Sequence, residues 1–129
     1  MAGAFLKKIL IVDDEEEALI HLGNILRRAN YEVISATKGK EAVKLAKEQR
    51  PDLIILDIVM PDLEGGEVAA ILEENPSTAE IPIVFLTGIL TKNEDLLGKT
   101  SGKRHVIAKP AMPKDLLEMV SKLLNKDVD

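Results

Sequence analysis

Residues 53–61, with the sequence LIILDIVMP, join the most apolar run of the chain to a single acid. The first four residues of this stretch are leucine and isoleucine, a composition typical of a strand that is buried on both faces. Asp57 follows them directly, and Pro61 ends the stretch. An ionised carboxylate at the end of a buried strand is unfavourable unless another group compensates its charge. The rest of the chain is therefore expected to supply such a group.

Four other short apolar segments alternate, as this one does, with segments of helical periodicity. The predicted strands cover residues 9–12, 33–36, 53–56, 83–86 and 105–108. Parallel strands need crossover connections, so a regular alternation of strands and helices predicts a parallel sheet with helices on both faces. The predicted fold class is therefore a doubly wound five-stranded α/β sheet, formed by a single domain over residues 1–129.

Five segments between and after these strands are predicted to be helical. They lie at residues 15–30, 41–49 and 66–74, near Thr91, and from Pro113 onward. In the first of them, apolar residues recur at spacings of three and four, which gives one apolar face made of Ala18, Leu22, Ile25 and Ala29.

The composition excludes several kinds of function. The chain has no cysteine, which rules out thiol nucleophiles, disulfides and sulfur-ligated metal centres and fits the cytoplasm as its location. A net charge of -5 opposes a nucleic-acid surface, and one Tyr and two Phe leave few rings to stack on bases. No apolar run approaches the roughly 18 residues that a membrane span requires. Neither a nucleic acid nor a membrane is therefore an expected partner.

Polar residues follow four of the predicted strands at their carboxyl ends. They are Asp13, Asp14, Asp57, Thr87 and Lys109. Ligands of doubly wound sheets bind beyond the carboxyl ends of the strands, so these side chains are expected to meet at one rim. Three carboxylates at one rim repel one another unless a cation lies among them. Oxygen ligands without a nearby His or Cys favour Mg²⁺ as that cation.

The same residues resemble the receiver domains of two-component response regulators, over about residues 7–126. The segments that carry the resemblance are VDDE at 12–15, LDIVMPDLEGG at 56–66, LTG at 86–88 and KP at 109–110. The resemblance implies a flavodoxin-like sheet with the strand order 2-1-3-4-5. It also implies that the loop after the acceptor carries the family's glycine at Gly65.

The resemblance assigns a role to each polar residue at the rim. Asp57 would be the phosphoryl acceptor, Thr87 would hydrogen-bond a phosphoryl oxygen, and Lys109 would neutralise the phosphoryl charge. Magnesium would be held by the side chains of Asp13, Asp14 and Asp57 and by the backbone carbonyl of Val59. Phosphoryl transfer requires a nucleophile, a metal and a fixed cation, so the chemistry fits these roles.

The function implied by the resemblance is that of a phospho-accepting signalling switch. It would receive a phosphoryl group from the phosphohistidine of a sensor histidine kinase or phosphotransfer protein, and then change its affinity for a downstream protein. It would catalyse only its own phosphorylation and dephosphorylation. Loss of the phosphoryl group is predicted to be slow, because Val59 and Ile89 are apolar where some relatives place polar groups that position a water.

The sequence departs from the receiver pattern near its last predicted strand. Receivers commonly carry Tyr or Phe three residues before the lysine, and this chain has Val106 there. The residue after KP is Ala111 instead of the frequent Phe, and residues 98–104 read GKTSGKR. These changes concern the route by which the switch acts on a partner and leave the phosphorylation residues intact.

Two other functions remain open from the sequence. A phosphohydrolase of the haloacid-dehalogenase type would need a second acid two residues after its nucleophile, where Val59 stands. A receiver-like protein-binding scaffold without phosphorylation would not need the acids or Lys109 that this chain carries. No DNA-binding segment is recognised, so the chain is expected either to act through protein contacts or to be one domain of a longer regulator.

Overall fold

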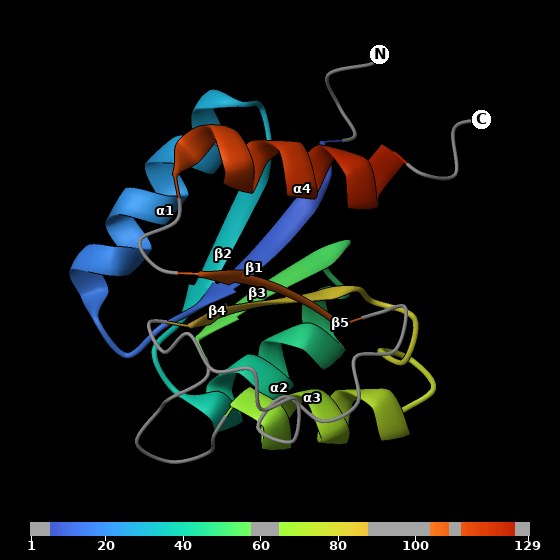
Figure 1. Ribbon diagram of the computed structural model, residues 1–129. Helices are drawn as coiled ribbons and strands as arrows, with labels where there is room; N and C mark the ends of the chain where they lie inside the picture. The colour runs from blue at the N-terminus through green and yellow to red at the C-terminus, as the bar shows by residue number, and fades with distance from the viewer. Residues whose placement is uncertain (1–5, 58–64, 88–103, 109–111, 126–129) are drawn as a thin grey trace.

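Parallel strands form one sheet at the centre of the molecule, as the computed structural model in Figure 1 shows. The structure describes residues 6–57, 65–87, 104–108 and 112–125. Within these residues the strands are β1 (Lys8–Val12), β2 (Glu32–Ala36), β3 (Leu53–Asp57), β4 (Ile83–Thr87) and β5 (Arg104–Ala108). Their order in the sheet is β2-β1-β3-β4-β5, and every neighbouring pair is parallel. The predicted fold class and strand order are confirmed.

Helices cover both faces of this sheet. The described helices are α1 (Glu16–Arg28), α2 (Gly39–Gln49), α3 (Gly65–Glu74) and α4 (Pro113–Asn125). Figure 1 shows α1 and α4 on one face and α2 and α3 on the other. The helix predicted near Thr91 falls outside the described residues. The layered arrangement leaves only the ends of the strands open to a ligand.

Two hydrophobic clusters fill the spaces between the sheet and the two helical layers. Successive residues of a strand point to opposite faces, so each central strand contributes to both clusters. On β3, Ile54 and Leu56 join the cluster under α2 and α3, while Leu53 and Ile55 join the cluster under α1 and α4. All five residues of β3 are buried, which confirms that the LIIL run forms a strand covered on both sides.

The apolar face of α1 is centred one residue away from the predicted face. The buried residues are Leu19, Leu22, Gly23 and Leu26. Ala18 and Ile25 are half-buried, so they lie at the edge of the face. Ala29 is the C-cap of the helix and does not belong to its last turn. The leucines take the centre because they bury more apolar surface there than an alanine would.

Backbone hydrogen bonds and one ion pair tie the strands together at their amino ends. The backbone N–H of Lys8 donates to Oδ2 of Asp52 over 2.7 Å, and the N–H of Asp52 donates to the carbonyl of Lys8 over 2.7 Å. The Lys8 ammonium donates to Oε1 of Gln49 at 3.1 Å and lies 3.9 Å from Oε2 of Glu32. Lys8 therefore fixes β1 against β3, and also contacts the start of β2, at the end of the sheet opposite to Asp57.

The ends of α2 and α3 are held by different contacts. At the start of α2, the N-cap residue Lys38 makes no side-chain capping bond, and Oε1 of Glu41 instead accepts the N–H of Thr37 at 3.1 Å. Beyond the end of α3, the buried hydroxyl of Thr78 donates to the carbonyl of Leu72 at 2.6 Å. The exposed Glu41 thus holds the chain at the start of α2 and still contributes a negative charge there.

Replacing Phe85 by Ala should strongly destabilise the fold. Phe85 is fully buried in β4, and removing its ring leaves a cavity under α2 and α3, at a cost of about 3–5 kcal/mol. Urea unfolding measures the loss. Ile20→Ala is the matched control, because that side chain is 61% exposed and its removal should change the free energy of unfolding by less than about 0.5 kcal/mol. Equal effects of the two substitutions would contradict this account of the core.

Candidate functional site

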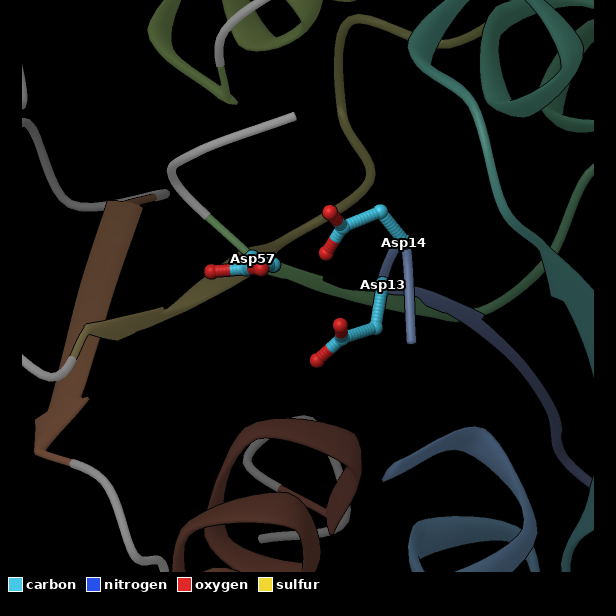
Figure 2. A group of neighbouring side chains, drawn as sticks. All are labelled: Asp13, Asp14 and Asp57. Carbon is cyan, nitrogen blue, oxygen red and sulfur yellow. The ribbon is translucent and has the colours of Figure 1, made fainter. Parts of the chain in front are cut away.

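Three aspartates from two neighbouring strands meet at the carboxyl edge of the sheet. Asp13 and Asp14 follow β1, and Asp57 ends β3 (Figure 2). One carboxylate oxygen from each of them lies within 4.8 Å of the others. The register explains the meeting: Val12 pairs with Leu56, so the next residue along each strand is an aspartate. The structure thus brings together the three acids that the sequence placed at one rim.

Asp13 is held rigidly by two backbone contacts. Its side chain is 0% exposed. Its N–H donates to the carbonyl of Ala36 at 3.2 Å, which continues the pairing of β1 with β2 by one residue. Its Oδ1 accepts the N–H of Glu15 at 3.0 Å, so the carboxylate also caps the chain where it turns into α1. Backbone and carboxylate are therefore both oriented before any ligand binds.

The three carboxylates differ in how far they can move. Asp57 is 8% exposed, on the last residue of a strand that is buried throughout. Asp14 is exposed, and its side chain lies at the solvent side of the group. Buried carboxylates at this spacing repel one another and have little water to screen them. The group thus consists of two fixed acids and one that can adjust its position.

The donor set fits a small divalent cation. Mg²⁺ would bind carboxylate oxygens at about 2.0–2.1 Å. One oxygen from each of the three aspartates lies within 4.8 Å of the others, and the exposed Asp14 side chain is free of the burial that fixes Asp13 and Asp57. No His or Cys belongs to this group, and hard carboxylate oxygens suit magnesium better than they suit zinc or copper.

The other predicted site residues are described only in part. Thr87 is the last residue of β4, one position beyond Leu86, which pairs with Asp57. Its backbone therefore lies at the same rim as the three acids, and its side chain is outside the description. Ala108 ends β5 opposite Thr87. Val59 and Lys109 fall outside the described residues, so their roles stay predictions.

One feature of the site was not recognised in the sequence. The contact between the Asp13 carboxylate and the Glu15 amide follows a common pattern, in which an aspartate accepts the N–H two residues later at the start of a turn or helix. From the sequence, Asp13 and Asp14 are predicted to be magnesium ligands. In the structure Asp13 combines a helix-start contact with a place in the acidic group.

Comparison with known families agrees with the fold. The family model described as the response regulator receiver domain matches residues 9–121. The chain belongs to this family. Receiver domains are the phospho-accepting switches of two-component signalling, and the chain is homologous to them over most of its length.

Named relatives include both single receivers and longer regulators. The chain is 38% identical over 120 residues to the alkaline phosphatase synthesis transcriptional regulatory protein PhoP of Bacillus subtilis, a match that covers 93% of this chain and 49% of PhoP. It is 32% identical to the protein PilH of Pseudomonas aeruginosa, covering 91% of this chain and 97% of PilH. The chain thus spans about half the length of PhoP and nearly all of PilH.

A solved structure shows the same architecture. The chemotaxis response regulator CheY4 of Vibrio cholerae superposes with a TM-score of 0.85 at 31% identity, covering 93% of this chain and 100% of CheY4. Among the residues that the structure describes, no helix combines the length and hydropathy of a membrane span.

Asp57→Asn should stabilise the protein in metal-free buffer. The substitution removes one of three carboxylates that lie within 4.8 Å of one another, which relieves repulsion of about 1–3 kcal/mol. Urea unfolding in the presence of a chelator measures the change. Glu74→Gln, at an exposed acid near the end of α3, should have no comparable effect. An unchanged or lower stability of the Asp57 variant would show that the carboxylates do not repel in the folded protein.

Proposed function

We propose that this receiver domain accepts a phosphoryl group on Asp57 with magnesium bound beside it. The observation that carries the proposal is the position of the Asp57 carboxylate: it ends a strand buried on both faces and lies within 4.8 Å of the carboxylates of Asp13 and Asp14. A rigid strand end suits a nucleophile, because in-line attack on phosphorus tolerates little error in position. Membership in the receiver family supports the assignment.

The proposed reaction transfers one phosphoryl group between two side chains. A carboxylate oxygen of Asp57 attacks the phosphorus of a phosphohistidine, and the bond between phosphorus and the imidazole nitrogen breaks. The imidazole leaves with the electron pair and takes up a proton from solvent, while Asp57 becomes an acyl phosphate. Receiver domains interact with histidine kinases or phosphotransfer proteins, so a protein of this kind is the proposed donor.

In this proposal the metal is held by Asp13, Asp14 and Asp57 with the backbone carbonyl of Val59. When bound, a divalent cation offsets the negative charge that the carboxylates and the phosphoryl oxygens bring together. Asp13 offers a carboxylate already oriented by the Glu15 amide. Asp14, being exposed, adjusts to complete the ligand set. The protein therefore needs little rearrangement to bind the ion.

Thr87 and Lys109 are proposed to receive the phosphoryl oxygens once Asp57 is modified. Phosphorylation adds charge that a hydroxyl and an ammonium can hydrogen-bond, and such contacts reposition the loops that carry them. The resulting change in the surface alters affinity for a downstream protein. The domain catalyses only its own phosphorylation and a slow dephosphorylation, and it works in the cytoplasm, as the absence of cysteine favours.

Asp57→Asn should abolish phosphorylation, because an amide cannot act as the nucleophile. Purified protein is incubated with acetyl phosphate and Mg²⁺, and the number of phosphoryl groups on each chain is measured by intact-protein mass spectrometry. The wild type should gain a single phosphoryl group, and Glu74→Gln should match it. Phosphorylation of the Asn variant at the wild-type level would refute the assignment of Asp57. Turnover of a phosphate monoester would instead indicate a phosphohydrolase.

Asp13→Asn and Asp14→Asn should each weaken Mg²⁺ binding by at least about tenfold, because each removes a charged ligand. Isothermal titration calorimetry without any phosphodonor measures the affinity directly. The rise in melting temperature caused by Mg²⁺ should shrink in parallel, since only binding to the folded state stabilises it. Asp52→Asn, an exposed acid at the opposite end of β3, serves as the control. Unchanged affinity in both site variants would place the metal elsewhere.

A further inference from the structure

Two consecutive segments of the chain carry opposite charges. Residues 38–50, which include α2, hold Lys38, Lys40, Lys44, Lys47 and Arg50 against only Glu41 and Glu48. The sequence then contains no Lys, Arg or His from residue 51 to residue 91, although that stretch holds eight acids. Within it, α3 and the turn that follows carry Glu67, Glu73, Glu74 and Glu80. The separation of charge along the sequence is therefore nearly complete.

The fold places these two segments next to each other on one face. Helices α2 and α3 contact each other, and both cover the same side of the sheet, away from α1 and α4 (Figure 1). Lys40, Lys44 and Lys47 are exposed on α2 beside the exposed Glu41 and Glu48, and Glu67 and Glu74 are exposed on α3. We call this surface the α2–α3 face. Over residues 38–50 its charge is positive on balance, whereas every charged residue of α3 and of the turn that follows is an acid.

This pattern of charge restricts the kind of partner that the α2–α3 face can bind. A nucleic acid or an anionic membrane would be attracted to α2 and repelled by α3. A basic partner would be attracted to α3 and repelled by α2. A complementary partner needs a negatively charged region facing α2 and, beside it, a positively charged region facing α3. A second copy of this chain supplies such a surface. We propose that two copies associate through their α2–α3 faces.

Charge complementarity also selects the symmetry of the pair. A two-fold interface uses the same patch on both copies. An axis that crosses the two helices would place α2 on α2 and α3 on α3, so that like charges meet. An axis that runs between the helices and along them places α2 of each copy on α3 of the other. Only the second arrangement forms two attractive contacts, and both are identical.

The association is expected to be weak and sensitive to salt. The two helices have 11 and 10 residues, so each is about 15 Å long, and two packed helices are roughly 20 Å across. This footprint is smaller than that of a standard stable interface. Exposed ion pairs contribute little each, and the net charge of -5 on each copy opposes contact. The association must therefore be measured at high protein concentration.

A charge-swap experiment tests the pairing. Lys40→Glu with Lys44→Glu shifts the charge of the α2–α3 face toward negative, and Glu73→Lys with Glu74→Lys shifts it by the same amount toward positive. Both changes suit the helix dipole, since acids are added toward the start of α2 and bases at the end of α3. Sedimentation equilibrium should show weak dimers of the wild type, no dimers of either variant alone, and in an equal mixture heterodimers at least fivefold tighter than the wild-type dimer.

A matched variant separates the proposed interface from general attraction between unlike charges. Lys114→Glu with Lys122→Glu produces the same change in net charge on exposed residues of α4. Mixed with the basic-face variant, it should form heterodimers no tighter than the wild-type dimer. A mixture of the two swapped variants that stays monomeric, or a control mixture that associates equally well, would overturn the proposal.

Two further measurements keep the test informative. Circular dichroism melting verifies that each variant is folded, and the single substitutions Lys44→Glu and Glu74→Lys replace any double variant that is not. Raising NaCl from 50 to 500 mM should weaken the heterodimer at least tenfold, because salt screens the exposed pairs. All measurements use unphosphorylated protein without a phosphodonor. The result is therefore independent of whether Asp57 accepts a phosphoryl group.

Discussion

The register between β1 and β3 is the constraint on which the site depends. Because Val12 pairs with Leu56, the residues that follow them, Asp13 and Asp57, come to lie side by side at the edge of the sheet. Helical layers on both faces keep these strands buried and fixed. The same burial makes two adjacent carboxylates costly, so the fold creates a local demand for positive charge. A cation bound beside the three carboxylates would meet that demand, and it would also offset the charge of a phosphoryl group.

In the proposed magnesium site, the acids would combine one fixed ligand with one adjustable ligand. Asp13 is buried and oriented by the amide of Glu15, whereas Asp14, its neighbour in the chain, is exposed. A fixed ligand lowers the entropy lost on binding, and an adjustable one can accommodate the ion and a phosphoryl group. Two adjacent residues of the same type would thus serve different purposes, because the backbone pairing of β1 with β2 continues through Asp13 and Asp14 lies beyond it.

Much of the fold could be predicted from the sequence, because the strands are short apolar runs and the acids directly follow them. The resemblance to receivers was needed for the strand order, since periodicity does not say which strands are neighbours. The centre of the α1 face was placed wrongly, because Ala18 and Ile25 fit a helical spacing as well as Leu19 and Leu26 do. The contact of opposite charges on α2 and α3 could not be read from the chain, as it depends on both helices covering the same side of the sheet.

The contacts of Lys8 lie at the end of the sheet farthest from the acids. Its backbone and ammonium join the beginning of β1 to Asp52 before β3, to Gln49 at the end of α2 and to Glu32 at the start of β2. The contacts that align the strands and the candidate site therefore lie at opposite ends of β1 and β3. Residues around the acids can be substituted without removing the contacts that keep these strands in register.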